Sequence, residues 1–504
     1  MTIAVTLFVL AALALPAGAL VEDCITAPEV NERCAAWSYQ YPEGDPAQDS
    51  CSDQPAGLVI GRDAVYLTGT TSCSSSNTWD ILTMALGFDG RLLWTTRHEG
   101  SLQLRHEGYG LTLSPDGSTV YVAGSEDNGQ DDDWIVLAYD ATTGGTKWVT
   151  RYDGPSGGED QAWVIAASED GERVYVSGFV RAPASDGGES VDIATASLDA
   201  NTGGIDWVER YASLQGWSDF PRAIAVRGER VVVTGSSLDS PRQDLITLAY
   251  RDDRERHRAE PLWAQSYDGG DWDQPAIPCL QRQLSICGAM GTISVTADTV
   301  AITATSFLVP TTDDAVWTTI AYDLETGGRR WLRHRGNPEY QNKANAIGAS
   351  PDGETIYVTG FENDELLFDG VGDAVTVAYD TDTGQERWVA NEALPAIDDA
   401  AAFNMTATND TVYVTGAVHY TPTEVPRVDA LIVAYDAATG TRDWIARHNR
   451  FESQRAGLGG YDGGHWVGLT PDGSRVILGG DAANILRLES SADHRDFAVV
   501  AYDA

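Results

Sequence analysis

The sequence predicts an all-β protein, an eight-bladed β-propeller of four-stranded antiparallel blades, closed by an N-terminal strand that completes the last blade. Three observations lead to this prediction: a repeated motif, a set of strand signals in each repeat, and an N-terminal segment that supplies a missing strand. Repeats about 57 residues apart indicate an array in which each unit buries its apolar face on its neighbours. The motif reads roughly Ala-Tyr-Asp-x-x-Thr-Gly-x-x-x-Trp and occurs at 138–148, 197–207, 321–331, 378–388 and 434–444, with weaker copies at 88–94 and 249–263.

Each repeat carries signals for four short strands. The first is apolar, as at 162–166, and a turn such as Ser114-Pro115-Asp116-Gly117 leads into the second, because Pro and Gly supply the backbone angles of a hairpin. The third strand ends in the Tyr-Asp of the motif, and the fourth carries its Trp. The second strand reads roughly Val-Tyr-Val-x-Gly and occurs at 65–69, 120–124, 174–178, 231–235, 300–305, 356–360, 412–416 and 476–480. Four such strands describe one propeller blade.

The count of strands predicts how the ring closes. Eight third strands are present, but only seven are followed by a fourth strand with its Trp, and the chain ends at Ala504. The segment 34–41, with Trp37, resembles the fourth strand around Trp148. We therefore expect it to complete the last blade, so that 34–504 form a ring without a long unpaired edge. Each fourth-strand Trp is expected to pack between adjacent blades, where burial of ~200 Å² of indole contributes a few kcal/mol.

The repeated signature resembles the tryptophan-docked repeats of PQQ-type, quinoprotein-like β-propellers, and also generic propeller repeats of secreted bacterial proteins. The resemblance covers about residues 34–504. It is specific for the fold and weak for activity, because function depends on sites placed on a fold.

Composition and the N-terminus restrict location and partners. With 75 acidic and 33 basic residues the net charge is −42, which argues against nucleic acid and anionic membrane surfaces as partners. The apolar run 3–15, followed by Ala17-Gly18-Ala19, predicts a signal peptide at 1–19 and a lead-in at 20–33; a retained N-terminal anchor is the alternative. No later stretch qualifies as a membrane span. We expect a monomer that is secreted or held in the cell envelope.

Six cysteines fit an oxidising compartment. Cys279 and Cys287 are close enough in sequence for a loop disulfide. Cys51 and Cys73 are expected in loops of one blade on the same face, which predicts a second pair and leaves Cys24 with Cys34. The connectivity stays open at this point.

The connections predict which face can bind a ligand. Turns between the first and second and between the third and fourth strands are tight, whereas the other connections are long, so a working surface is expected on the long-loop face. Every third strand opens with Asp, and five first strands begin near one: Asp53, Asp160, Asp219, Asp399 and Asp462. A cation site is one interpretation of this acid ring. The other, which we favour, is that these residues accept backbone N–H groups in every blade.

A specific site should lie where the repeat symmetry breaks. His106 and Asn342 stand where other blades carry Asp, and the insertion 268–291 adds Trp272 and Asp273. The acidic loop with Asp127, Asp131 and Asp133 offers oxygen ligands that suit Ca²⁺, although it lacks the ordered spacing of an EF-hand loop and also fits a solvated loop. These residues are the candidate ligand and metal positions.

Two classes of function follow. The first is a secreted binding or scaffold module that takes a small molecule, glycan or protein at the long-loop face. The alternative is a quinoprotein-type dehydrogenase with PQQ and Ca²⁺ in the central funnel. The resemblance implies adjacent cysteines over the quinone in many such enzymes, and none occur here, so we do not expect PQQ. A hydrolase or lyase using paired carboxylates is a third class, but no pair stands out.

Overall fold

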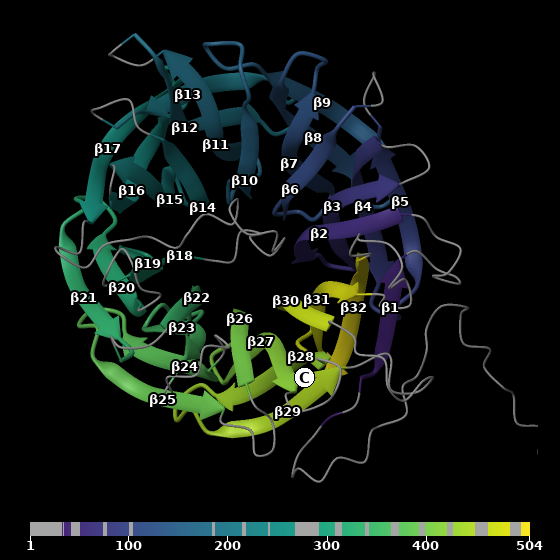
Figure 1. Ribbon diagram of the computed structural model, residues 1–504, viewed down its shortest axis with the longest axis vertical. Helices are drawn as coiled ribbons and strands as arrows, with labels where there is room; N and C mark the ends of the chain where they lie inside the picture. Colours follow the sequence, from purple (N-terminus) through teal and green to yellow (C-terminus); the bar gives the residue numbers. More distant parts are fainter. Residues whose placement is uncertain are drawn as a thin grey trace, which may run out of the picture.

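The structure is a ring of eight blades. The computed structural model describes residues 33, 35–41, 51–73, 78–99, 104–183, 187–213, 218–239, 242–267, 292–307, 315–337, 342–363, 372–392, 399–420, 427–448, 462–483 and 495–504. These residues form eight separate four-stranded sheets arranged around a central opening (Figure 1). All strand pairings within these sheets are antiparallel, which confirms the predicted fold class.

The strands run from the centre of the ring outward in chain order. Blades 1 to 4 are β2 (Cys51–Ile60), β3 (Ala64–Cys73), β4 (Thr78–Gly87), β5 (Leu92–His98); β6 (His106–Leu113), β7 (Thr119–Asp127), β8 (Asp132–Asp140), β9 (Thr146–Tyr152); β10 (Gln161–Ala167), β11 (Arg173–Pro183), β12 (Glu189–Asp199), β13 (Ile205–Tyr211); and β14 (Asp219–Arg227), β15 (Arg230–Asp239), β16 (Arg242–Asp253), β17 (Arg258–Tyr267). Blades 5 to 7 are β18 (Ile293–Val295), β19 (Thr299–Phe307), β20 (Ala315–Asp323), β21 (Arg329–Arg335); β22 (Asn342–Ala349), β23 (Thr355–Glu362), β24 (Asp373–Asp380), β25 (Glu386–Glu392); and β26 (Asp399–Ala407), β27 (Thr411–Tyr420), β28 (Arg427–Asp436), β29 (Arg442–His448).

Blade 8 joins the two ends of the chain, as predicted. It consists of β30 (Asp462–Leu469), β31 (Arg475–Ala483), β32 (Arg495–Asp503) and, outermost, β1 (Trp37–Tyr41). β1 pairs antiparallel with β32, with Trp37 opposite Ala501 and Tyr41 opposite Phe497. The ring is therefore closed by hydrogen bonds between its first and last strands.

The repeated Gly of the second strand has a steric cause. In seven blades the first strand carries a β-bulge opposite this Gly. A Cβ added to Gly360 would lie 1.9 Å from the carbonyl oxygen of Lys343, so only Gly permits this close approach. Blade 5 has Ala304 at this position, and the described pairing of its first strand stops at Ile293 opposite Ile302.

The Trp of each repeat docks on the next blade. Trp148 Nε1 donates to Ala200 O at 3.0 Å, and Gly203 of the following Thr-Gly turn lies against the same ring. Gly203 has a φ of +72°, and a Cβ added there would lie 2.5 Å from the indole. The Trp of one motif and the Gly of the next thus form a single contact. The indole donates to the next blade in seven cases: Trp37 to Phe88, Trp94 to Ala141, Trp148 to Ala200, Trp207 to Asp252, Trp263 to Leu324, Trp331 to Thr381 and Trp388 to Ala437.

Two docking contacts are built differently. Blade 4 lacks the Thr-Gly turn, and Trp207 donates to the buried carboxylate of Asp252 at 2.7 Å. Trp444 faces blade 8, whose outer strands β32 and β1 are not consecutive in the chain and share no Thr-Gly turn, and the guanidinium of Arg33 covers its ring at 4.6 Å. The backbone N–H of Arg33 also donates to Ile445 O at 2.9 Å, so the lead-in residue takes the place of the missing turn.

Cys51 and Cys73 are direct partners in the register of β2 and β3. This placement agrees with the pairing expected from the sequence, which remains a prediction. Cys24, Cys34, Cys279 and Cys287 lie outside the described residues, as does the expected signal peptide. Among the described residues, no helix is long and apolar enough to cross a membrane.

Gly203→Ala is expected to lower the free energy of unfolding by ~3–4 kcal/mol, because it adds a clash with the Trp148 ring to the strain of a positive φ. The matched control is Gly473→Ala, at a φ of +66° with nothing within 4 Å of the added Cβ, and we expect a loss of ~1–2 kcal/mol there. Denaturant unfolding of both variants measures the difference. Equal losses would show that the glycine serves the turn and not the indole.

Candidate binding face

The turn face of the ring is committed to its own turns. In the Asp-x-x-Thr-Gly connection of blade 6, Asp380 Oδ1 accepts from the backbone and hydroxyl of Thr383 at 3.0 and 2.7 Å. Arg387 donates to the other oxygen of Asp380 at 2.8 Å. Its hydrogen bond, together with those from Thr383, holds the pKa of Asp380 at about 2. These carboxylates stabilise turns, which leaves the long-loop face as the surface on which the blades differ.

On the long-loop face, the residue at the start of the innermost strand links two connections by accepting backbone N–H groups. We call this contact the tether. Asp160 is fully buried and accepts N–H groups from Arg181, at 2.8 Å, and from Gly154. Its burial raises its pKa to about 6. Asp219 accepts the N–H of Ser213 at 2.7 Å from the same position in blade 4. The backbone-acceptor interpretation of the acid ring therefore holds at these two positions.

Asn342 has the same structural role in blade 6. Its Oδ1 accepts from the N–H of Asn363 at 3.2 Å, and its Nδ2 donates to Asn337 O at 2.8 Å. Asn342 starts β22 and His106 starts β6, four blades away around the ring (Figure 1). The structure does not bring these two predicted ligand residues together, so they do not form one site.

His106 breaks the symmetry in a different way. The N–H of Asp127, which corresponds to that of Arg181 in blade 3, donates to the backbone oxygen of Arg105 at 3.0 Å. The His106 side chain therefore does not accept this backbone N–H, although the side chain is fully buried. Neither of its ring nitrogens has a hydrogen bond, and burial lowers its pKa. The ring of His98 faces it, with centroids 6.0 Å apart in an edge-on arrangement.

Four of the third-strand aspartates contact the fourth strand of their own blade, a type of partner that the sequence did not predict. Each meets the side chain three residues after the Trp: Asp80 with Arg97 at 3.4 Å, Asp192 with Arg210 at 3.3 Å, Asp244 with Ser266 at 2.9 Å, and Asp496 with Gln40. In blade 2 this residue is Arg151, which binds both carboxylate oxygens of Glu126 instead. Asp133 is left without an arginine, and burial raises its pKa.

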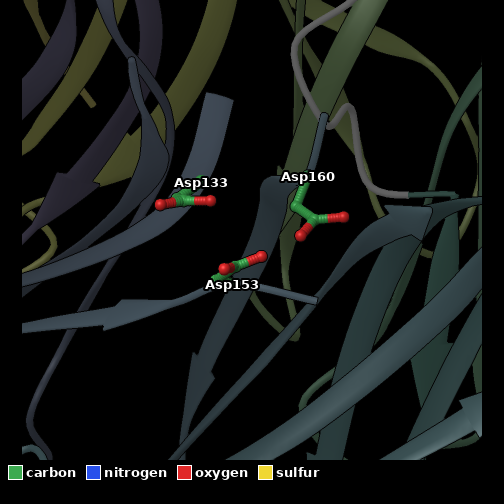
Figure 2. A group of neighbouring side chains, drawn as sticks. All are labelled: Asp133, Asp153 and Asp160. Atoms are coloured by element: carbon green, nitrogen blue, oxygen red, sulfur yellow. The ribbon is translucent and has the colours of Figure 1, made fainter. Parts of the chain in front are cut away.

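Asp133 lies with Asp153 and Asp160 at the seam between blades 2 and 3 (Figure 2). One oxygen from each lies within 4.8 Å of the others, a donor set that could hold a hard cation such as Ca²⁺. The other two predicted metal residues are not in this group. Asp127 accepts the N–H of Gly129, and Asp131 accepts from the Asn128 amide, both at 2.7 Å, so they shape their own loop.

Sequence reasoning missed Asp153 as a partner of Asp133. It stands in the connection between β9 and β10, at a position that carries Asp in one other blade, as Asp268. Asp160 was visible, but only as a member of the acid ring. The order of the blades could have predicted their proximity, because the start of the third strand of one blade lies beside the connection that leads to the first strand of the next blade.

Comparison with known proteins supports the repeat assignment. Residues 84–259 and 292–481 match a family model described as outer membrane protein assembly factor BamB. The chain belongs to this BamB family. No curated protein sequence matches it. The expected PQQ-type repeat propeller is thereby confirmed, and the match identifies no specific enzyme.

Three solved structures that are similar to this chain come from different organisms. BamB from Moraxella catarrhalis is 13% identical with a TM-score of 0.44, over 89% of this chain and 96% of its own. Quinohemoprotein alcohol dehydrogenase ADHIIG from Pseudomonas putida HK5 is 12% identical with a TM-score of 0.49, over 90% and 75%. Sqt1 from Saccharomyces cerevisiae is 10% identical with a TM-score of 0.49, over 94% and 100%. At these identities the likeness concerns the fold alone.

The match to the BamB family is interrupted at 260–291. This gap contains Trp272 and Asp273, two of the predicted ligand residues, together with Cys279 and Cys287. All four lie outside the described residues. The insertion therefore lies outside the matched segments, and its proposed part in ligand binding remains a prediction.

The tether at Asp219 predicts a pH dependence of stability. Burial raises the pKa of this carboxyl from 3.8 to about 6, so between these values the folded protein binds more protons than the unfolded chain. Its contribution is fully present below pH 4 and is lost as the pH rises through 6. Denaturant unfolding at pH 4 to 7 should show Asp219→Asn gaining ~2 kcal/mol relative to the wild type.

Asp380→Asn is the control for this experiment, because its carboxyl titrates at about 2 and should give a constant difference above pH 4. A difference for Asp219→Asn that does not change with pH would contradict the prediction.

Proposed function

We propose that the protein is an extracytoplasmic binding or scaffold propeller that holds a protein partner on its long-loop face. The observation that carries the proposal is the contrast between the two faces: acids of the turn face are used in repeated turns, whereas the long-loop face changes at blade 2. The description of the family, outer membrane protein assembly factor, agrees with a protein-binding role outside the cytoplasm. A net charge of −42 favours a cationic partner surface.

The alternative is a quinoprotein-type dehydrogenase, and the group Asp133, Asp153 and Asp160 is the observation that favours it, since such an enzyme needs a cation. Two of these carboxylates come from β8 and the end of β9, the two outer strands of blade 2. The group therefore belongs to a seam between blades rather than to the central opening in which a quinone would be expected. This placement supports the binding module over the enzyme.

A reconstitution assay separates the two functions. Purified protein with added PQQ and Ca²⁺ is expected to reduce no dye when alcohols or sugars are supplied, because the acids of the inner-strand tether are already occupied by backbone N–H groups. Dye reduction that depends on PQQ would overturn the proposal in favour of the dehydrogenase.

Photo-cross-linking tests the binding face directly. A photoreactive amino acid at exposed Gln130, in the β7–β8 connection, is expected to give covalent protein adducts in cells that carry the protein in their envelope. The matched control is Asp382 in a turn of the opposite face, where the side chain is 81% exposed. Adducts at Asp382 in equal or greater yield would assign the partner to the wrong face.

A further inference from the structure

Two histidines replace a repeated pair at the seam between blades 1 and 2. Four residues after the docking Trp, blades 2 and 3 carry Tyr152 and Tyr211, each close to the Asp that opens the next inner strand. At the first seam the corresponding residues are His98 and His106. Both members of the pair have changed, and both have become the same metal-binding type of side chain.

The surroundings of His106 lack the partners that a buried imidazole needs. Its side chain is fully buried, and neither Nδ1 nor Nε2 forms a hydrogen bond. Asp160, Asp219 and Asn342 accept backbone N–H groups at this position. In blade 2 the backbone oxygen of Arg105 accepts the corresponding N–H instead. Buried polar groups without a partner are rare in native proteins and indicate an ion or water that fills the gap.

The neighbouring side chains complete a set of donors. His98 Nε2 lies 3.7 Å from Glu126 Oε1, a separation that one metal ion can bridge with bonds of about 2 Å. The His106 ring lies with its centroid 6.0 Å from that of His98, and no hydrogen bond fixes its orientation, so coordination of the same ion would require this ring to rotate towards Glu126. Arg151 binds both oxygens of Glu126 and orients its carboxylate, as outer partners of metal ligands commonly do.

We propose that His98, His106 and Glu126 form a binding site for a divalent transition metal such as Zn²⁺. Two imidazoles and one carboxylate are a donor set that selects such metals over Ca²⁺, which prefers oxygen ligands alone. The buried carboxylate of Asp80 adds negative charge nearby. The site is separate from the group Asp133, Asp153 and Asp160, and it stands independently of the partner proposed above.

Calorimetric titration of tag-free protein with Zn²⁺ alone, in excess Ca²⁺ to occupy all-oxygen sites, tests the proposal. We expect one Zn²⁺ per chain, a Tm that rises with Zn²⁺ concentration, and visible absorption when Co²⁺ is bound instead. The double variant His98→Tyr/His106→Asp recreates the Tyr152–Asp160 pair, so it should fold and bind Zn²⁺ at least 100-fold more weakly. His257→Asn, at an exposed histidine of the turn face, is the control and should bind like the wild type.

Two results would overturn the site: no stoichiometric binding of Zn²⁺ by the wild type, or unchanged affinity in the double variant. Should the double variant fail to fold, His98→Tyr alone serves, because this side chain is 18% exposed and its loss leaves the buried His106 in place. Its affinity for Zn²⁺ is expected to fall at least tenfold, and an affinity equal to that of the wild type contradicts the proposal.

Discussion

The contact between the Trp of one blade and the Thr-Gly turn of the next is the interaction on which the ring depends. It buries an indole, satisfies its N–H with a carbonyl of the neighbouring blade, and requires a residue without a Cβ at a positive φ, as at Trp148 and Gly203. Because the two halves of the contact belong to successive repeats, each repeat must carry both. This requirement fixes the orientation of every blade, and with it the face on which the long connections lie.

The two places where the contact is rebuilt show what it must provide. In blade 4 the carboxylate of Asp252 replaces the carbonyl, and it also accepts from the Tyr175 hydroxyl at 2.7 Å and lies 3.3 Å from Arg254. A buried charge is tolerated there because several partners compensate for its lost hydration. At Trp444 no Thr-Gly turn joins β32 to β1, and Arg33 supplies a cation over the ring and a backbone hydrogen bond. In both places a charged side chain contacts the indole: Asp252 accepts its N–H, and Arg33 lies over its ring.

The same repetition decides how much the sequence could reveal. Periodic features predicted the blades, their number and the closure by the segment around Trp37, because each is stated many times along the chain. The partners of individual acids were not predictable in this way. Arg151 stands three residues after the Trp, where Arg97 and Arg210 contact a third-strand Asp, yet it binds Glu126 in the second strand. Asp153 recurs as Asp only once, at Asp268 of blade 4, so the folded ring and not the repeat places it beside Asp133.

A departure from the repeat is informative in proportion to what changes with it. Asn342 replaces an Asp and still links two connections, so the departure is absorbed by the scaffold. At His106 the backbone oxygen of Arg105 accepts the N–H instead of the side chain. The facing residue is His98, where blades 2 and 3 carry Tyr. A single exchange that keeps its contacts needs no ligand to explain it. Coordinated exchanges that leave both nitrogens of a buried imidazole without a hydrogen bond are what the proposed metal site would explain.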